Sequence, residues 1–533
     1  MLIESIDVYL VRLPLITPFN TSYGDTDVIE SVLVRLTSEG QEGWGEATAW
    51  AAPNYCPEYA GGVFDVIQRF LGPAVLGRTF EDAEALQAAM RPFKGNPFAK
   101  SALDTAWWDL FAKMQGQPLW RVLGGNGPTV DVGADFGVME SIDALLQCID
   151  GAVRQGFKRI KLKFRPGWDV DMVAAVRRTF PDVVFHIDCN SAYTLADAAM
   201  FETLDAYNLA MIEQPLGYDD LVDHAELQRR IRTPICLDES ITSPSKARKA
   251  IELGAARWIN VKPGRVGGLT PAKEILALCE RAGVPCWIGG MLESNIGAAH
   301  CLALATLPNV KYPSDVFPSD RFYKHDLADP PTVLSGPSQI TAVDGPGIGV
   351  RVAMDRLRAA TIRHVTQRAN NRTRVPVSRT TTASGNMETF RIEQASRDDF
   401  LEIAELDRLT WHESFIADGE HTWRIWCEHA TVLTARDSKD NALIGVLLCF
   451  PGERDTDVLH KIFVHPDHRG RGVGSSLMRA FLQNAQRPVL LTCDPQNTPA
   501  LHTYERFGFQ RAALIEGYYR PNEHRYEMRW EPR

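Results

Sequence analysis

Between residues 126 and 320, short apolar runs alternate with stretches whose apolar residues recur at helical spacing. Buried strands that alternate with amphipathic helices predict βαβ units and a parallel sheet. Six such units in about 200 residues, without a GxGxxG turn, favour a closed α/β barrel of the (β/α)8 type over an open doubly wound sheet. The six apolar runs are residues 159–163, 183–188, 209–214, 234–238, 257–262 and 285–290.

Three of the predicted helices have a recognisable start. Thr194, Ser243 and Thr270 each precede a helical pattern, and Pro follows directly after the last two. A Ser or Thr side chain accepts a hydrogen bond from a free amide at a helix start, and Pro at the first position removes another free amide. We therefore expect all three residues to be helix N-caps.

The rest of the chain divides at changes of composition. Residues 1–125 begin with two strand-like segments and turn helical over residues 98–114, which predicts an α+β capping domain before the barrel domain, residues 126–365. Residues 366–387 are rich in Arg, Thr, Asn and Ser and have little apolar surface to bury, so we expect a flexible linker. A nucleic-acid-binding arm is the alternative, but no aromatic residues are interleaved there. Residues 388–533 are long enough for a further α+β domain.

Composition and charge exclude several classes of function. No apolar run reaches 18 residues, so we expect no membrane span. The net charge of −10 argues against nucleic acid as the main partner. The ten cysteines include no CxxC pair, and we expect reduced thiols in a cytoplasmic protein.

Five ionisable residues recur once per predicted βα unit: Lys163, Asp188, Glu213, Asp238 and Lys262. Their separations are 188 − 163 = 25, 213 − 188 = 25, 238 − 213 = 25 and 262 − 238 = 24. The C-terminal ends of barrel strands converge on one mouth, where catalytic residues lie. A single Asp after a strand is commonly only a helix cap, but five residues in phase predict an active site.

Three neighbouring carboxylates repel one another unless a cation lies between them. Oxygen ligands without a nearby Cys favour Mg²⁺ or Mn²⁺ over zinc. We expect Asp188, Glu213 and Asp238 to bind this metal, which would stabilise the enediolate formed when a substrate loses its α-proton. His186 lies two residues before Asp188, and we expect it to fill the barrel interior.

Lys161 and Lys163 alternate on one strand, so both side chains face the barrel interior. Nearby cations disfavour the ammonium form, and we expect them to lower the lysine pKa towards that of a general base. Lys262 would approach from the opposite side of the ring. Two lysines on opposite faces of a carbanion can each remove and return a proton, which predicts racemisation.

Six motifs occur in order along the chain: KLK at 161–163, HIDCN at 186–190, IEQPL at 212–216, CLDES at 236–240, NVKPGRVGG at 260–268 and GGMLESNIG at 289–297. They resemble the enolase superfamily, muconate-lactonising subgroup, and most closely its N-succinylamino acid racemases and o-succinylbenzoate synthases. The resemblance covers Met1 to about Val365.

The resemblance implies a role for each motif residue. It makes Asp188, Glu213 and Asp238 the metal ligands and Lys163 and Lys262 the acid/base pair. It adds Lys161 and Asn190 as helpers next to the substrate and Glu239 and Glu293 as residues behind the ligands. The N-terminal domain would cover the mouth with loops near Pro18-Phe19 and from Trp44 to Tyr55.

The resemblance leaves the reaction open, because the family performs both a racemisation and a dehydration with the same residues. Arg265 resembles a position that tunes the second lysine in racemases, although a surface arginine that caps the next helix is the alternative. Residues 295–298 read Asn-Ile-Gly-Ala where related racemases often have Gly-Ile-Gly-Arg, so the preferred N-acyl group stays open. Dipeptide epimerase and muconate cycloisomerase activities fit the same scaffold.

A strand-like run at residues 459–466 leads into a glycine-rich turn and a helical pattern. Glycines let successive backbone amides point at one anion, and the helix N-terminus adds its positive dipole end. We expect a pyrophosphate there. The turn consists of Arg469, Gly470, Arg471, Gly472, Val473 and Gly474.

Further along are Asn497-Thr-Pro-Ala500, Tyr504 and Phe507-Gly508-Phe509. Together with the turn they resemble the GNAT acyltransferase family. The resemblance implies that the amides of residues 470–475, up to Ser475, bind the pyrophosphate of acetyl-CoA or succinyl-CoA. It also implies that Asn497 orders the site and that Tyr504 protonates the leaving thiolate. A non-catalytic CoA sensor is the alternative.

These expectations combine into a bifunctional enzyme. Residues 388–533 would acylate the nitrogen of an amino acid, and the barrel would racemise the N-acyl product, in particular an N-succinyl amino acid. The rival hypothesis is an o-succinylbenzoate synthase with an unrelated or regulatory GNAT domain. All substrates would be small molecules, and we expect the barrel domain to form a homo-oligomer.

Overall fold

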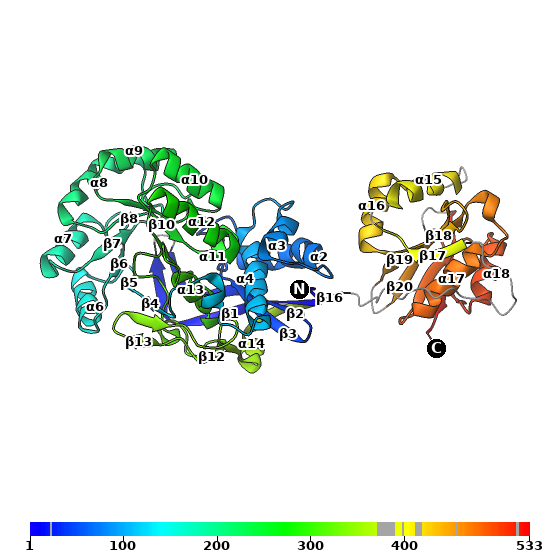
Figure 1. The fold of residues 1–533 in the computed structure, drawn as a ribbon, viewed down its shortest axis with the longest axis horizontal. Helices are drawn as coiled ribbons and strands as arrows, with labels where there is room; N and C mark the ends of the chain where they lie inside the picture. Colours follow the sequence, from blue (N-terminus) through cyan, green and yellow to red (C-terminus); the bar gives the residue numbers. More distant parts are fainter. Residues whose placement is uncertain are drawn as a thin grey trace. The chain divides into compact units, whose positions relative to one another are not determined.

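The computed structural model consists of two compact units, Met1–Asn371 and Arg372–Arg533, each described here by itself (Figure 1). The structure describes residues 1–21, 24–369, 390–396, 399–410, 418–452, 456–518 and 522–532. In this part of the chain, no helix is both long enough and apolar enough to cross a membrane.

A four-stranded antiparallel sheet forms the N-terminal part of the first unit, in the order β16-β1-β2-β3. Helix α4 lies against β3, where Gly43 and Gly45 leave room for the helix backbone; a Cβ at either position would collide with a carbonyl oxygen of α4. The elements of this part are β1 (Ser5–Thr21), β2 (Gly24–Ser38), β3 (Gln41–Ala47), α1 (Ala60–Val66), η1 (Ile67–Leu71), α2 (Gly72–Val75), α3 (Ala83–Met90), α4 (Pro97–Met114) and α5 (Leu119–Leu123).

The return strand β16 (Thr361–Arg368) corrects the predicted start of the linker. Thr366 pairs with Asp7 of β1, so it belongs to the first unit. The segment is polar because most side chains of this edge strand are exposed, and its composition therefore resembles that of a linker. Residues 370–387 of the predicted linker lie outside the described residues.

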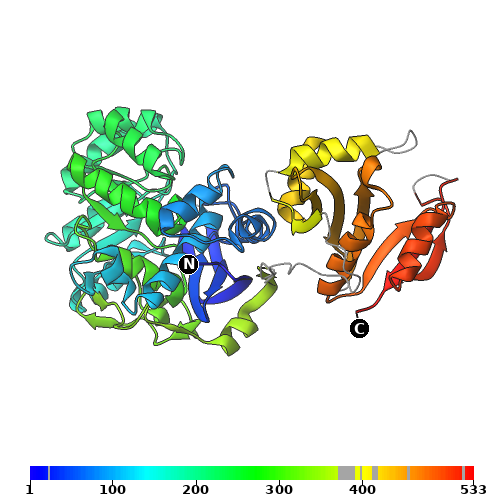
Figure 2. The ribbon, with the colours of Figure 1, turned by 45° about the vertical axis from the view of Figure 1, so that its right-hand side comes forward.

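A parallel sheet in the order β11-β10-β9-β8-β7-β6-β5 forms the barrel (Figures 1 and 2). Residues 310–315 bridge its two edges: Asp315 N donates to Ile288 O of β11 at 2.8 Å, and Gly133 N, directly before β5, donates to Ser314 O at 3.1 Å. The strands are β5 (Ala134–Phe136), β6 (Ile160–Lys163), β7 (Phe185–Asp188), β8 (Ile212–Glu213), β9 (Ile235–Leu237), β10 (Trp258–Val261) and β11 (Cys286–Ile288).

Helices surround this sheet on its outer side (Figure 1). They are α6 (Ile142–Arg154), α7 (Val170–Thr179), η2 (Leu195–Asp197), α8 (Ala198–Leu204), η3 (Asp205–Tyr207), α9 (Val222–Arg230), α10 (Pro244–Leu253), α11 (Pro263–Val266), α12 (Leu269–Ala282) and α13 (Asn295–Ala305). The first unit also contains β4 (Thr129–Asp131), η4 (Ser319–Arg321), β12 (Ala328–Asp329), β13 (Leu334–Gly336), β14 (Gln339–Thr341), β15 (Arg351–Val352) and α14 (Met354–Ala360).

Two of the three predicted helix caps are confirmed. Thr194 forms a capping box with Asp197, and the Ser243 side chain accepts from the Lys246 amide. Thr270 is not a cap, because α12 already begins at Leu269. Instead, Asp104 of α4 accepts from both the amide and the hydroxyl of Thr270, at 3.1 and 2.6 Å.

The second unit is built on one sheet in the order β17-β18-β19-β20-β21-β23-β22. Apolar residues of α15 and α16 form one core, and those of α17 and α18 form another with the alternate residues of β19. The elements are β17 (Phe390–Gln394), α15 (Phe400–Thr410), α16 (Glu420–His429), β18 (Thr431–Asp437), β19 (Leu443–Pro451), β20 (Asp457–Val464), η6 (Pro466–His468), α17 (Val473–Asn484), β21 (Val489–Cys493), α18 (Thr498–Arg506), β22 (Gln510–Ile515) and β23 (Arg525–Trp530).

Strands β20 and β21 are parallel but paired only at one end. Their register comprises Asp457 with Val489 and Val458 with Leu490, although β20 continues to Val464. The remaining backbone groups of the two facing edges are therefore not used in pairing between these strands. The separation of β20 from β21 lies in the middle of the sheet, and β20 leads directly to the glycine-rich turn.

Candidate active sites

Strand register explains why residues 25 apart meet in the barrel. Lys163 of β6 pairs with Asp188 of β7, and Asp188 pairs with Glu213 of β8. These three side chains therefore lie at one level on the inner side of neighbouring strands. All are buried, and Asp188 and Glu213 have at most 1% of their surface exposed.

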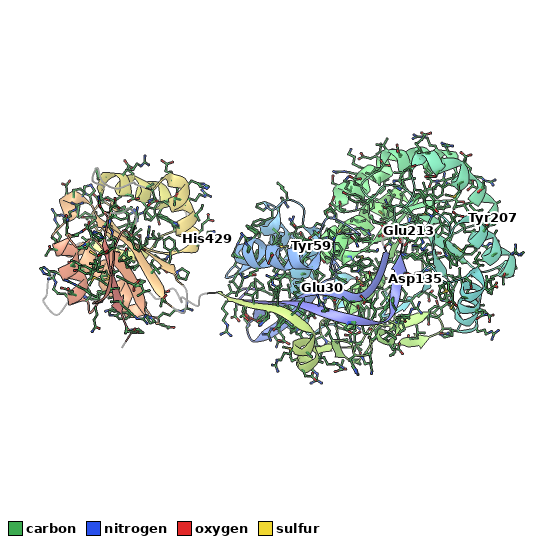
Figure 3. All side chains as sticks on the ribbon, turned by 180° about the vertical axis from the view of Figure 1, so that it is seen from behind. Glu30, Tyr59, Asp135, Tyr207, Glu213 and His429 are labelled. Carbon is green, nitrogen blue, oxygen red and sulfur yellow. The ribbon has the colours of Figure 1, made fainter. Side chains whose placement is uncertain are left out.

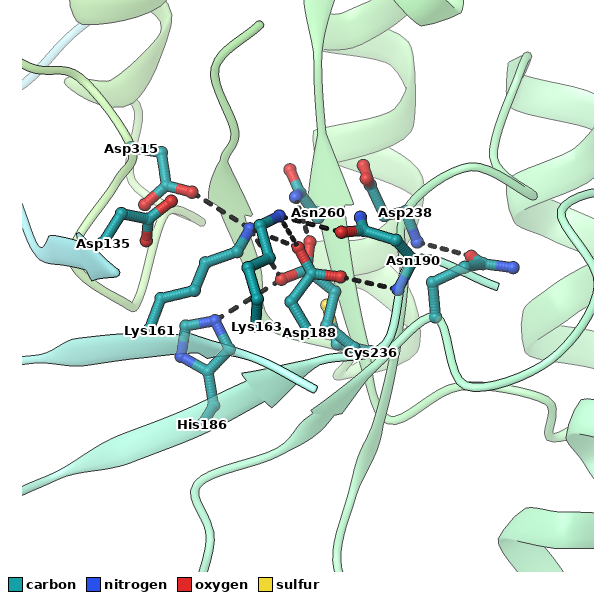
Figure 4. A network of polar contacts seen from close by, with 12 residues as sticks. Asp135, Lys161, Lys163, His186, Asp188, Asn190, Cys236, Asp238, Asn260 and Asp315 are labelled. Carbon is teal, nitrogen blue, oxygen red and sulfur yellow. Dashed lines mark hydrogen bonds and ion pairs between the residues drawn. The ribbon is translucent and has the colours of Figure 1, made fainter. Parts of the chain in front are cut away.

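Lys161 lies between the carboxylates at this level (Figure 4). Its Nζ is 3.0 Å from Asp188 Oδ2, 2.9 Å from Glu213 Oε2 and 3.2 Å from Asp315 Oδ2. Lys163 Nζ donates to Asp188 Oδ2 at 2.7 Å and to Asn190 Oδ1 at 3.0 Å. Lys161 and Lys163 are thus in direct contact with Asp188, and Lys161 also contacts Glu213.

Asp238 and Lys262 form a second group at the ends of β9 and β10. Lys262 Nζ donates to Asp238 Oδ2 at 2.9 Å, and Arg265 also contacts Asp238. The Tyr55 hydroxyl, from the N-terminal domain, donates to Asp238 Oδ2 at 3.2 Å and accepts from Lys262 and Arg265 at 3.3 and 2.9 Å. Arg265 is 1% exposed, so the alternative of a surface arginine is wrong.

The charges of the chain alone do not lower the pKa of Lys161 or Lys262. Although burial opposes the ammonium form, Asp188 and Glu213 raise the pKa of Lys161 well above its usual value. Burial lowers the pKa of Lys262 as well, but Tyr55 and nearby carboxylates outweigh burial and raise this pKa above its usual value. At Asp188, burial favours the neutral acid, but Lys161 and Lys163 outweigh it and lower the pKa. The negative groups around Lys161 and Lys262 therefore affect their pKa more than the positive groups do.

The donor set of the barrel fits a hard divalent cation. Asp188, Glu213 and Asp238 supply only oxygen atoms, from adjacent strands and in a buried site, as Mg²⁺ and Mn²⁺ prefer. In the described part of the chain, no three His, Cys, Asp or Glu side chains already enclose a common point suited to a metal. The ammonium groups of Lys161 and Lys262 and the guanidinium group of Arg265 contact these carboxylates.

A cavity of about 40 Å³ lies between the two groups. Lys161, Lys163 and Lys262 line it, together with Phe19 and Trp50 of the N-terminal domain. The predicted cover of the mouth therefore includes Phe19, Trp50 and Tyr55. Trp44 is not part of the cover, because it is buried in the N-terminal core and stacks on Tyr9.

The other residues singled out in the sequence lie around this centre. His186 is fully buried, 3.2 Å from the Tyr312 hydroxyl, and fills the barrel interior as predicted. Asn190 donates to Glu239 Oε1 at 3.3 Å. Glu293 accepts from the Met291 amide, and burial raises its pKa to about 7.

Asn295, the first of the residues 295–298 that differ from the sequence common in related racemases, has a structural role. The Asn295 side chain donates to the carbonyls of Ala328 and Pro330 at 2.9 and 3.0 Å and accepts from the Ala328 amide. It therefore anchors a neighbouring segment. Neither Asn295 nor Ala298 lines the lysine cavity.

Sequence reasoning missed Asp135 and Asp315, which also line the cavity. Figure 3 shows Asp135 and Glu213 in the interior of the barrel domain. Asp135 pairs in register with Lys161, and 161 − 135 = 26, close to the repeat of the other site residues. That spacing could have revealed Asp135, but its strand has only three residues and no long apolar run.

The glycine-rich turn of the second unit opens directly onto α17. Gly470 and Gly472 have φ of +72° and +85°, a left-handed conformation that favours glycine, and Gly472 is the N-cap of the helix. The first amides of a helix lack partners within it. The Arg469 side chain turns back to donate to Val464 O at 3.2 Å.

The remaining predicted residues of this unit lie on α18. Asn497 caps the helix by accepting from the Ala500 amide at 3.2 Å. Tyr504 contacts the ring of Phe509, and burial raises the pKa of its phenol, so the phenol stays protonated at neutral pH. A protonated phenol is the form that an acid catalyst needs.

Comparison with known proteins relates the first unit to a family. The model for the mandelate racemase / muconate lactonizing enzyme N-terminal domain matches residues 5–124, and the enolase C-terminal domain-like model matches residues 144–356. An N-succinylamino acid racemase from Thermus thermophilus is 44% identical over 363 residues, 68% of this chain and 98% of that protein. An o-succinylbenzoate synthase from Geobacillus kaustophilus is 44% identical over 351 residues, 66% of this chain and 93% of that protein.

A solved structure agrees with these matches. An enolase-superfamily member from Listeria innocua superposes with a TM-score of 0.67 and 36% identity, covering 69% of this chain and all of that one. For the second unit, the model of the GNAT acetyltransferase family matches residues 400–509.

Proposed function

Because the chain belongs to the enolase superfamily and ends in a GNAT acyltransferase domain, we propose that it is a bifunctional enzyme of N-acyl amino acids. The barrel racemises an N-acyl amino acid, and the GNAT domain transfers an acyl group from acyl-CoA to the nitrogen of an amino acid. The relatives support a racemase or an o-succinylbenzoate synthase activity for the barrel, and the GNAT match supports acyl transfer.

The observation that carries the racemase is the placement of Lys163 and Lys262. They belong to β6 and the end of β10, which lie across the ring from each other when residues 310–315 complete it. Both lysines line the same cavity. A substrate α-carbon between them would have one amine on each face.

The reaction needs only proton transfers from the chain. A neutral lysine on one face takes the α-proton, and the electron pair of the C–H bond moves into the substrate carboxylate. The ammonium group of the other lysine then returns a proton to the opposite face, which inverts the centre. Lys161 would hold the carboxylate of the substrate by its positive charge.

The three carboxylates Asp188, Glu213 and Asp238 would hold the metal. Members of the superfamily depend on Mg²⁺, which when bound supplies positive charge beside the substrate carboxylate as its negative charge increases.

Isotope exchange tests this assignment. Wild-type enzyme in D2O with Mg²⁺ should exchange the α-proton of both enantiomers of an N-acyl amino acid. Lys163→Ala and Lys262→Ala should each abolish racemisation, and each should retain exchange with at most one enantiomer. Equal exchange of both enantiomers by both variants contradicts the two-lysine mechanism.

The alternative for the barrel is o-succinylbenzoate synthase, the activity named for two relatives that, like the racemase, are 44% identical. The same carbanion chemistry then ends in loss of hydroxide instead of return of the proton. Dehydration of the succinylbenzoate precursor, with no exchange of any N-acyl amino acid, would identify this activity as the function of the barrel.

For the second unit, we infer that the amides of residues 470–475 bind the acyl-CoA pyrophosphate. The splayed pairing of β20 and β21 leaves backbone groups to bind the rest of the thioester. Tyr504 would then give its proton to the sulfur when the acyl group leaves, and the pKa of its phenol suits this role. Tyr504→Phe should slow acyl transfer while the Kd of CoA stays within about threefold. Wild-type rates in this variant would contradict the role.

The two activities would follow one another. Acylation removes the ammonium charge of an amino acid, which a cavity with three lysines disfavours. A free D-amino acid with acetyl-CoA or succinyl-CoA should therefore yield first the N-acyl-D form and later the L form in chiral chromatography. Tyr504→Phe should slow both products and Lys262→Ala only the second. If the barrel does not racemise the acylated product, the two reactions do not follow one another as proposed.

A further inference from the structure

The lysine cavity contains two carboxylates that the proposed proton transfers do not use. Asp315 is neutralised: Arg159 Nη2 donates to it at 2.5 Å, and Lys161 Nζ is 3.2 Å away. Asp135 is not neutralised to the same degree. Among the described residues, its one ion pair within 4 Å is with Arg159, at 3.4 Å, and the same guanidinium forms a shorter ion pair with Asp315, at 2.5 Å.

Burial and the charge of Asp315 raise the pKa of Asp135 to about 6. Lys161, Arg159 and Lys163 favour the ionised form, but burial and Asp315 outweigh them. The carboxyl group is mostly ionised at neutral pH, and these cations compensate only part of the cost of its buried charge. Only 9% of the side-chain surface is exposed. Such a group favours a neutral or positive neighbour and disfavours a negative one.

Asp135 also lies where a substrate would extend. The strand β5 is across the ring from β9, where Asp238 is one of the proposed metal ligands, and Figure 4 shows Asp135 and Asp315 on the far side of the lysines from Asp238. A substrate whose carboxylate lies beside the metal ligands and whose α-carbon lies between Lys163 and Lys262 directs its remaining groups towards β5.

We propose that Asp135 makes the barrel select acyl groups without a second carboxylate, so that its substrates are N-acetyl rather than N-succinyl amino acids. This inference rests on the proposed racemase function and specifies its substrate class. A succinyl group would bring a carboxylate into the same small cavity as Asp135, where solvent cannot screen their repulsion. Acetyl has no charge and avoids this repulsion.

A series of three substrates of one amino acid tests the sign of the effect. N-acetyl-, N-succinyl- and N-glycyl-methionine carry an acyl group with charge 0, −1 and +1. The assay is α-proton exchange in D2O with Mg²⁺, and the measured quantity is the ratio of kcat/KM between substrates. This ratio does not depend on the fraction of correctly folded enzyme.

Wild-type enzyme should favour acetyl over succinyl by about tenfold to hundredfold, the range that two nearby charges produce at a partly screened site. Asp135→Asn keeps the shape and removes the charge, so the kcat/KM ratio of succinyl to acetyl should rise by a similar factor and the ratio of glycyl to acetyl should fall. The control is Asp131→Asn on β4, which removes an exposed carboxylate paired with Lys158 at 2.7 Å and should leave all ratios unchanged.

The possible failures are distinguishable. A wild-type preference for succinyl, or ratios that Asp135→Asn leaves unchanged, refutes the selectivity of Asp135 while the racemase function stands. Exchange of none of the three substrates by wild-type enzyme refutes the racemase function and this inference with it.

Discussion

Arg159 offers a test of how the barrel is closed. Its side chain is fully buried at the junction of β5, β6 and residues 310–315. It donates to Pro313 O at 2.6 Å and to Asp315 at 2.5 Å, and its guanidinium is 5.4 and 5.6 Å from the ring centroids of Trp287 and Tyr312. The substitution Arg159→Met keeps much of the volume and removes all of these interactions.

The expected cost follows from these contacts. Removing one partner of a buried ion pair typically costs about 3–5 kcal/mol, since the other charge stays buried. Lys161, at 3.2 Å, still compensates part of the Asp315 charge, so we expect the lower half of this range. The neighbouring pair Lys158–Asp131 is the matched control, because both side chains are about half exposed, at 51% and 42%. Lys158→Met should cost about 1 kcal/mol or less.

Hydrogen exchange of the full chain, followed by mass spectrometry, measures the effect where it should occur. Peptides from residues 132–136 and 310–316 should exchange roughly a hundredfold faster in Arg159→Met and less than about tenfold faster in Lys158→Met. Gly133→Ala should reproduce the Arg159→Met result, because a Cβ at Gly133 would collide with the guanidinium. Equal exchange in Arg159→Met and Lys158→Met refutes the view that Arg159 holds the ring closed.

Three further predictions concern the metal, the turn and pH. Chelation or Asp188→Asn should abolish α-proton exchange and leave acyl transfer intact in the same sample; exchange that persists in excess chelator contradicts the metal role. Gly472→Val should weaken CoA binding, measured by calorimetry, by about tenfold or more, since φ is +85° there; Gly474→Ala, with no close contact at its Cβ, should bind normally. Burial raises the pKa of Asp104 from 3.8 to about 6, so the folded state binds a proton that the unfolded state has lost. Its contribution to the free energy of unfolding should be full below pH 3.8 and disappear as the pH rises through 6, and Asp104→Asn should lack this component in urea titrations.

The amino-acid sequence by itself determined the order of the elements and several of the residues that meet at the mouth of the barrel. Buried strands and amphipathic helices leave periodic apolar patterns, and a βα unit of nearly constant length places Lys163, Asp188 and Glu213 at matching positions. Such local and repeated features are visible along the chain because each depends on nearby residues. The glycine-rich turn is visible for the same reason, since positive φ at Gly470 and Gly472 limits the residue type.

Only the tertiary structure decided which distant groups meet these residues. Residues 310–315 complete the ring through hydrogen bonds to Gly133 and Ile288. Asp104 of a distant helix accepts from the Thr270 amide, at the start of the helix that Thr270 was expected to cap. The buried position of Arg265, the contact of Tyr55 with Asp238 and the place of Asp135 in the cavity likewise depend on segments far apart in sequence. No local pattern records such contacts, because their energy arises only when the chain folds and removes both partners from water.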